Sequence, residues 1–352
     1  MNSVYLQLAE RLDKLPIGFP RTESGIELRI LERWFSPEEA AIAGQMSGAP
    51  EAVDLIAARL GRPAGDLGPV LYEMSRKGLI FRNGRGGEYS YNLVPLAEGM
   101  WEFHLNSLTP EDIRLLDEYI DFFMTTAWYG TKTSQHRIIP VTRGLTPEME
   151  ILPYEHAEAI IRAQSKISVA NCICRTEKDM MGQGCRHPRE VCLAFGTGAH
   201  YYIENGLGRE ITQDEAVAVL HQAMESGLVL QPGNGRKVWG ICMCCGCCCG
   251  LLKSLKKMDR PAEVAHTNFF ARNNPDECTA CGACVDLCPM AAISLCEVAA
   301  VDLHRCIGCG VCVAACSFEA MSLVQKKDAD RYVPPRNVVE MQMQIAKERG
   351  MI

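Results

Sequence analysis

The chain has 352 residues, of which 47% are hydrophobic and 22% are charged. This composition is typical of a globular protein and excludes a disordered or collagen-like chain. The net charge of −7 argues against a protein that binds nucleic acid or an anionic membrane through bulk charge. No apolar run is long enough for a spanning helix and no secretory signal is visible. We therefore expect a cytoplasmic protein without membrane insertion, with two or three domains.

Residues 1–100 are free of cysteine and predict a small helical module that ends in a hairpin. Periodic apolar residues and helix-start signals predict three short helices. A glycine-rich turn then separates two short strands, and this pattern is typical of a β-hairpin. The expected elements are helices over 37–46, 52–60 and 67–77, and strands over 79–82 and 89–93. This order is typical of a winged helix.

Charge argues against DNA as the partner of this winged-helix-like module. Residues 1–100 hold 11 Lys and Arg against 13 Asp and Glu. DNA binders need a basic face that neutralises phosphates, and only Arg76, Lys77, Arg82 and Arg85 cluster where DNA would lie. We expect a module that binds a protein and not nucleic acid.

Residues 101–260 predict a cysteine-rich α/β middle domain. Helices are expected over 110–127, 154–164 and 212–226, the last opened by a capping box of Thr212 and Glu215, and a loop over 130–146. Short apolar strands over 167–170 and 238–241 each lead into a run of cysteines. The sequence therefore predicts that the two runs lie at neighbouring strand ends and face each other.

Cysteine is the most informative residue type in the chain. All 19 cysteines lie between Cys172 and Cys316, and most of them are in tight runs. In a reducing compartment, clustered thiolates are more often metal ligands than disulfides. The sequence therefore predicts metal centres.

Residues 278–288 read C-T-A-C-G-A-C-V-D-L-C and residues 306–316 read C-I-G-C-G-V-C-V-A-A-C. Both are C-x2-C-x2-C-x3-C, and the second copy follows the first at an offset of 28 residues. This spacing is specific for iron–sulfur clusters, because three cysteines on one turn bind one cubane while the fourth reaches the other. Zinc is the alternative, although zinc sites use paired knuckles.

The repeat resembles the bacterial-type two-cluster ferredoxin domain, over about residues 268–325. The resemblance implies two 4Fe–4S clusters. It assigns one to Cys278, Cys281, Cys284 and Cys316, and the other to Cys306, Cys309, Cys312 and Cys288. Cys296 lies outside the repeat, and we expect it to be a small buried residue behind a strand.

The two remaining cysteine runs predict further metal binding. They hold ten cysteines: Cys172, Cys174, Cys185, Cys192, Cys242, Cys244, Cys245, Cys247, Cys248 and Cys249. The first four can form one site, either a 4Fe–4S cluster or a tetrathiolate zinc, near the charges of Arg175, Arg186 and Arg189. His187 can replace one ligand. The second run can supply four ligands and spares, share ligands with the first run, bind something non-standard, or act as a redox dithiol. Gly246 is expected to let its loop fold tightly against a metal.

The whole chain is similar to 4Fe–4S binding proteins of anaerobic bacteria that join a winged-helix-like start, N-C-x-C-R and I-C-x-C-C-G-C-C-C elements and a terminal ferredoxin domain. We expect an α+β multidomain protein with a helical tail over 326–352. The leading hypothesis is an electron-transfer component of an anaerobic oxidoreductase, with redox partner proteins and no organic-substrate site of its own. The alternatives are an iron–sulfur redox or iron sensor that regulates transcription, and a reductase with a catalytic cluster in the 242–249 run.

Overall fold

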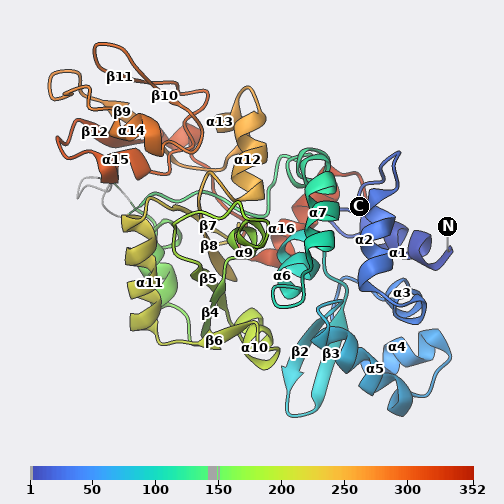
Figure 1. Ribbon diagram of the computed structural model, residues 1–352. Coiled ribbons are helices and arrows are strands. Elements are labelled where there is room, and N and C mark those ends of the chain that lie inside the picture. Colours follow the sequence, from blue (N-terminus) through green and yellow to red (C-terminus); the bar gives the residue numbers. More distant parts are fainter. Residues whose placement is uncertain (1–2, 142–148, 150) are drawn as a thin grey trace. The chain divides into compact units, whose positions relative to one another are not determined.

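The computed structural model describes residues 3–141, 149 and 151–352 (Figure 1). It is a mixed helix and strand structure, as the sequence predicts. The chain divides into two compact units. The first contains residues 1–131, 200–208 and 342–352, and the second contains residues 132–199 and 209–341. The cysteine-rich sheet and the ferredoxin-like repeat therefore belong to the same unit.

The first unit is mainly helical around a core that includes Leu12, Leu31 and Phe123. Its regular elements are α1 (Ser3–Asp13), α2 (Ile26–Trp34), α3 (Pro37–Ala43), β1 (Glu51–Ala52), α4 (Val53–Leu60), α5 (Ala64–Arg76), β2 (Phe81–Arg85), β3 (Glu88–Asn92), η1 (Leu96–Met100), α6 (Trp101–Phe103), α7 (Pro110–Phe123) and η2 (Met124–Trp128).

The sequence predicts α3, α4, α5 and the β2–β3 hairpin but not β1. Strand β1 pairs with β3, so the hairpin becomes a three-stranded sheet of order β1-β3-β2. Two helices of this unit begin with capping boxes: Ser36 caps α3 with Glu39, and Thr109 caps α7 with Asp112. These capping boxes satisfy the first backbone N–H groups of each helix.

A five-stranded sheet of order β6-β4-β5-β8-β7 is central to the second unit. Its strands are β4 (Ile167–Asn171), β5 (Glu190–Phe195), β6 (Gly208–Glu210), β7 (Val229–Pro232) and β8 (Gly240–Cys244). Its helical elements are η4 (Pro153–Glu155), α8 (Ala157–Arg162), α9 (Ile173–Met180), α11 (Gln213–Glu225), α12 (Gly250–Lys257) and α13 (Pro261–Val264). Most of α10 (Thr197–Glu204) belongs to the first unit. Helix α11 packs against β4 and β5, and its predicted capping box of Thr212 and Glu215 is present. In the expected loop, residues 142–146 lie outside the described residues.

The expectation that the two cysteine runs follow neighbouring strands is wrong. Strand β5, which the sequence analysis does not predict, lies between β4 and β8 and is antiparallel to both. Strands β4 and β8 therefore run in the same direction, and their carboxyl ends meet at one edge of the sheet. The first run begins at Cys172 just after β4, while Cys242 and Cys244 lie within β8 itself.

The ferredoxin-like repeat forms two small antiparallel sheets with two short helices (Figure 1). Its elements are β9 (Phe269–Asn273), α14 (Ala283–Leu287), β10 (Ile293–Leu295), β11 (Ala299–Val301), α15 (Val311–Ala315) and β12 (Met321–Gln325). Strand β9 pairs with β12, and β10 pairs with β11. Each of the two sheets thus contains one strand from each half of the repeat, and this pairing holds the two halves together. A short helix η5 (Asp328–Asp330) and α16 (Val338–Glu348) follow.

Candidate metal centres

The backbone of the cysteine repeat is duplicated as closely as its sequence. Helices α14 and α15 begin and end at positions 28 residues apart. Positive φ angles recur at the same offset, at Gly282 and Gly310 and at Ala280 and Gly308. A side chain at Gly308 is excluded, because its Cβ would lie 2.1 Å from the carbonyl oxygen of Phe269. Each half therefore wraps its three nearby cysteines around the same tight turn.

The four cysteines assigned to the first cluster line one pocket. Cys278, Cys281, Cys284 and Cys316 border it, together with Leu295 and other residues. Three of these cysteines come from one turn and the fourth from the other half of the repeat. This lining fits a thiolate-held cubane with crossed ligation.

The second set is more deeply enclosed than the first. Cys309 is buried, whereas its counterpart Cys281 is exposed. Burial, with smaller contributions from the charges of Cys306 and Cys288, raises the pKa of Cys309 to about 12. These three thiols and Cys312 therefore interact electrostatically, as ligands of one anionic centre would.

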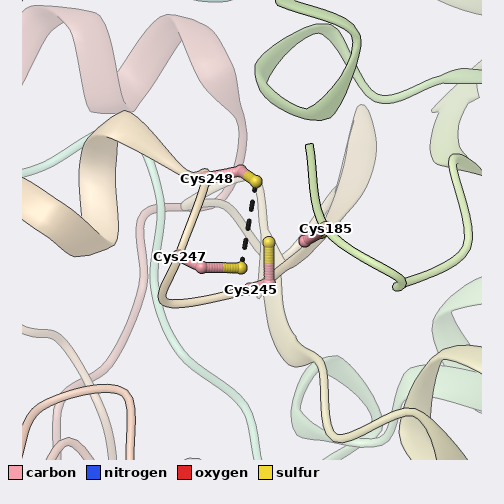
Figure 2. A group of neighbouring side chains, drawn as sticks. All are labelled: Cys185, Cys245, Cys247 and Cys248. Atoms are coloured by element: carbon pink, nitrogen blue, oxygen red, sulfur yellow. Dashed lines mark hydrogen bonds between the residues drawn. The ribbon is translucent and has the colours of Figure 1, made fainter. Parts of the chain in front are cut away.

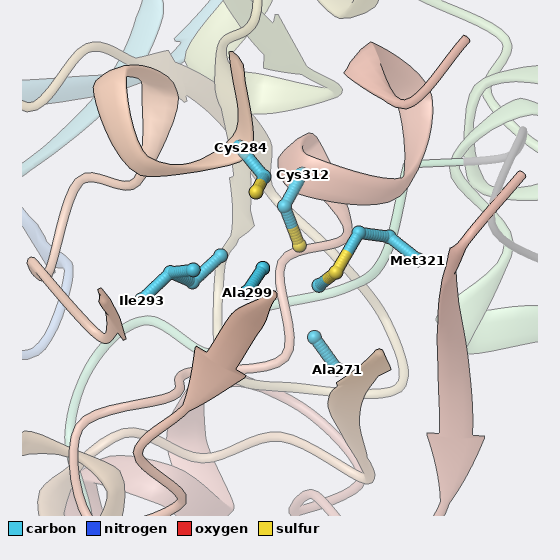
Figure 3. Packing of buried hydrophobic residues seen from close by; sticks show 6 residues of the cluster. All are labelled: Ala271, Cys284, Ile293, Ala299, Cys312 and Met321. Carbon is cyan, nitrogen blue, oxygen red and sulfur yellow. The ribbon is translucent and has the colours of Figure 1, made fainter. Parts of the chain in front are cut away.

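Cys284 and Cys312 lie in a common apolar core between the two sets (Figure 3). The rest of this core is Ala271, Ile293, Ala299 and Met321. Cys278, Cys288, Cys306 and Cys316 pack against it. An apolar shell of this kind excludes water and helps to set the potential of an iron–sulfur centre.

Backbone N–H groups point at several of these sulfurs. The N–H of Ala271 donates to Cys306 Sγ at 3.3 Å, and that of Ala292 donates to Cys288 Sγ at 3.2 Å. The N–H of Ala299 donates to Cys278 Sγ at 3.5 Å and is the main cause that lowers the pKa of this thiol. Such bonds favour the thiolate, which is the ligating form.

The prediction for Cys296 is wrong. This cysteine is exposed, and its N–H donates to the carbonyl of Val298 in the turn between β10 and β11. The residue lies in this exposed turn and not in a strand, so nothing covers it from behind.

A further group of four cysteines is assembled from both remaining runs (Figure 2). Cys185 comes from the first run, and Cys245, Cys247 and Cys248 come from the second. Their sulfur atoms all lie within 4.8 Å of one another. We call these residues the four-cysteine centre. The sequence predicts a site that joins Cys185 to Cys172, Cys174 and Cys192. In the structure, Cys185 lies beside three cysteines of the second run instead.

The spacing of these sulfurs fits a four-coordinate metal. In a tetrahedron with metal–sulfur bonds of about 2.3 Å, neighbouring sulfurs are ~3.8 Å apart. Cys247 Sγ and Cys248 Sγ are 3.8 Å apart. Four thiol groups within 4.8 Å of one another are a soft donor set that suits iron or zinc.

Arg175 supplies positive charge to this centre. Its side chain is buried, with 2% exposed, and donates to the carbonyl oxygens of Pro188 and Met243 at 2.9 and 2.7 Å. Burial acts to raise the pKa of Cys245, but the charge of Arg175 and hydrogen bonds outweigh it, and the pKa is lowered. A buried cation beside thiolates offsets the cost of placing them in the interior. Arg189, also noted in the sequence, forms an ion pair with Asp179.

The four-cysteine centre lies directly against the ferredoxin-like repeat. A Cβ at Gly246 would be 3.1 Å from both Cα and Cβ of Pro289, the residue that follows Cys288. Arg305, next to Cys306, holds the same junction by donating to the carbonyls of Lys256 and Met290 at 2.8 and 2.9 Å. Gly246 is therefore required for the packing of two loops, a role that its sequence context does not predict. The role of Arg305 is not predicted either, because its partners are backbone atoms and one of them, in Lys256, is distant in sequence.

The remaining predicted ligands lie close to the same edge of the sheet. Cys172 and Cys249 occupy the positions just before α9 and α12, and Cys174 lies in the first turn of α9. Cys242 and Cys244 are in β8, opposite Gln231 and Val229 of β7. Cys192 is in β5, opposite Ala170.

Comparison with known proteins bears on the repeat. Residues 272–294 and 299–322 match the 4Fe–4S binding domain. These segments contain all eight cysteines of the repeat, so a ferredoxin-type domain lies in this part of the chain. Neither the curated proteins nor the solved structures provide a match. Among the described residues, no helix has both the length and the apolar character that crossing a bilayer requires.

Proposed function

We propose that this protein is an iron–sulfur electron-transfer component of an anaerobic oxidoreductase. The observation that carries the proposal is the duplicated cysteine turn within a matched 4Fe–4S binding domain. When bound there, two clusters supply reversible one-electron chemistry. Cys278, Cys281, Cys284 and Cys316 hold one, and Cys306, Cys309, Cys312 and Cys288 hold the other.

The two thiol sets have different tasks in this proposal. The first is open to solvent at Cys281, so it suits exchange of electrons with a partner protein. The second is enclosed, and its Cys288 is followed by Pro289 at the loop of the four-cysteine centre. In this proposal an outer and an inner redox site act in series.

The four-cysteine centre is proposed to hold iron as a third redox site. Its position against the inner thiol set supports this role, since a purely structural metal has no need of that proximity. Cys185, Cys245, Cys247 and Cys248 would hold the metal, and Arg175 would offset its charge.

The helices and hairpin of residues 37–92 are proposed to be a winged helix that binds a protein partner. Two of the basic residues that DNA would need have acidic partners within the protein. Arg82 is buried and forms an ion pair with Glu204 at 3.0 Å, and Lys77 pairs with Glu39 at 2.6 Å. This supports a redox partner and gives no support to the regulator hypothesis.

Iron and sulfide quantification on anaerobically purified protein, with EPR of the reduced form, tests the proposal. At least eight irons per chain are expected from two 4Fe–4S clusters, with further iron in the four-cysteine centre. Zinc with negligible iron would overturn it.

A further inference from the structure

A cavity of about 290 Å³ opens between α4, α5 and β3 of the winged-helix-like module. Three aromatic side chains line it, and we call it the tyrosine pocket after them: Tyr72, Tyr89 and Tyr91. All of its lining residues belong to the first unit. Pockets for whole small molecules hold about 300–1,000 Å³, so this one has the size for a single large side chain.

The tyrosine pocket follows from the periodicities of a strand and a helix. Tyr89 and Tyr91 are two residues apart in β3, so both side chains lie on the same side of the sheet. Tyr72 and Gly68 are four residues apart in α5 and share one face of that helix. A Cβ at Gly68 would have Val53 Cγ1 at 3.8 Å as its one neighbour within 4 Å. The absence of a side chain at position 68 therefore helps to keep the pocket open.

The charge in the lining of the tyrosine pocket is negative. Glu73 follows Tyr72 in α5 and brings an exposed carboxylate to the pocket. Among the residues that the structure describes, no basic side chain pairs with Glu73, whereas Glu39 and Glu51 of the same module each have a basic partner. Neither lysine nor arginine is among the lining residues. A cation that enters the pocket therefore meets a carboxylate that is not already neutralised.

The tyrosine rings are suited to a guanidinium, as Arg82 shows. Its Cζ lies 4.5 Å from the centre of the Tyr72 ring and 5.3 Å from that of Tyr89. Arg82 is outside the pocket lining, and Glu204 offsets its charge at 3.0 Å. The ring centres of Tyr89 and Tyr91 are 6.4 Å apart, so the pocket offers several aromatic surfaces. Such rings attract cations, and arginine more often than lysine.

The tyrosine pocket takes up the part of the module where DNA would lie, between α5 and the β2–β3 hairpin. A recognition helix places its side chains in the major groove and works together with cations that neutralise phosphates. Helix α5 instead contributes Tyr72 and Glu73 to the pocket. The carboxylate would repel a phosphate and attract a cation. This surface therefore complements a basic ligand.

We propose that the tyrosine pocket binds an arginine side chain of the redox partner protein. The guanidinium would lie against the tyrosine rings and pair with the carboxylate of Glu73. Its planar, weakly hydrated group suits this combination better than the strongly hydrated ammonium of lysine. The inference deepens the proposed function and rests on it for the identity of the partner. It gives the protein-docking role of the module a specific site.

Saturation-transfer difference NMR on the full-length, cluster-loaded protein tests the site. The probe is the N-acetylated, C-amidated tripeptide Gly-Arg-Gly, and its control has citrulline, which is similar in shape and uncharged, in place of arginine. We expect binding of the arginine peptide and an affinity about fivefold lower for the citrulline peptide. Glu73→Gln should lower the affinity for the arginine peptide by about the same factor.

Two further variants separate the pocket from bulk charge. Glu88→Gln removes an exposed acid next to Tyr89 that is outside the pocket lining, and it should leave binding unchanged. Gly68→Leu fills the pocket without a change of charge, and it should abolish binding while the protein keeps its thermal stability.

The outcomes distinguish this inference from the proposed function. Absence of binding by the wild type, equal binding of the two peptides, or equal losses in Glu73→Gln and Glu88→Gln would each overturn the arginine site. Unchanged binding in Gly68→Leu would overturn it as well. Iron analysis of the same samples tests the electron-transfer proposal separately. Zinc with negligible iron would overturn that proposal and leave the result for the arginine peptide standing.

Discussion

Gly246 and Pro289 lie in direct contact although they belong to different cysteine motifs. A Cβ at Gly246 would approach Cα and Cβ of Pro289 to 3.1 Å, closer than ordinary van der Waals contact. Gly246 lies between Cys245 and Cys247 of the four-cysteine centre, and Pro289 follows Cys288 of the inner thiol set. The backbone that carries one set of ligands therefore touches the backbone that carries the other.

A larger side chain at Gly246 is expected to weaken electronic coupling without removing metal. Gly246→Val adds atoms where there is no room, so the two loops must separate. We expect slower intramolecular electron transfer in stopped-flow reduction, and a smaller spin–spin interaction in EPR, at unchanged metal content. Gly65→Val is the control, because nothing lies within 4 Å of its Cβ position. An unchanged rate of electron transfer in Gly246→Val would show that electrons do not cross the contact between Gly246 and Pro289.

Loss of one ligand from either half of the repeat is expected to remove one cluster. Cys281→Ala and Cys309→Ala should each lower the iron content by about four per chain, because each is assigned to a different cubane. The buried Cys309 is expected to be the more damaging site for stability, since its removal also leaves a cavity in a packed interior. Iron analysis and thermal melts of both variants check this. Equal iron in variant and wild type would contradict the assignment.

Substitutions at equivalent positions in the two halves of the repeat are expected to differ in their effect on stability. Gly308→Ala should be strongly destabilising, whereas Ala280→Gly should have a small effect. Gly308→Ala places a Cβ 2.1 Å from the Phe269 carbonyl oxygen at φ +64°, and should cost about 3 kcal/mol or more of stability. Ala280 is the equivalent position and has φ 54° with a side chain present. Ala280→Gly relieves that conformation and should change stability by no more than about 1 kcal/mol. Chemical denaturation of cluster-loaded protein checks both, and a mild effect of Gly308→Ala would contradict the close contact.

Arg305 is expected to stabilise the packing of α12 against the repeat through its hydrogen bonds. It donates to the carbonyls of Lys256, Met258 and Met290, and a lysine cannot reproduce this fork. Arg305→Lys should lower stability by about 1–3 kcal/mol and speed hydrogen exchange in α12. Arg336→Lys is the control at an exposed ion pair, where we expect a change within about 0.5 kcal/mol. Unchanged exchange in α12 would show that other contacts hold the junction.

The sequence predicts the repeat well because its signal is local. The spacing of Cys278 to Cys288, and its copy 28 residues later, fixes tight turns and short helices without reference to the rest of the fold. The helices with caps, such as that opened by Thr212, are predicted for the same reason.

The four-cysteine centre depends on relationships that are not local. Cys185 joins Cys245 only because an unpredicted strand, β5, sets the order of the sheet. Sequence spacing alone groups Cys185 with its neighbours Cys172 and Cys174. Similarly, Gly246 carries no signal of its contact with Pro289, since any tight loop can contain glycine. These features follow from strand pairing and packing between residues that are far apart in the sequence. Local sequence patterns do not predict such contacts.

The N-terminal module is expected not to bind DNA. Residues 1–100 carry more acids than bases, and Arg76, Lys77 and Arg82 each have a partner within the protein. Arg76 donates to the carbonyl of Glu204 at 2.7 Å, and Arg82 lies over the ring of Tyr72 at 4.5 Å with 3% of its surface exposed. The side chain of Arg85 lies outside the described residues. Few cations therefore remain to release counterions from a duplex.

A filter-binding titration with mixed genomic fragments at low salt, on protein that holds its clusters, checks this expectation. We expect weak binding that disappears at physiological salt and selects no sequence. Lys77→Glu is a useful companion variant, because its ammonium pairs with Glu39 and its loss should leave that weak binding nearly unchanged. Tight, sequence-selective binding that persists at physiological salt would contradict the protein-docking role. It would make a cluster-dependent transcription regulator the better description of this chain.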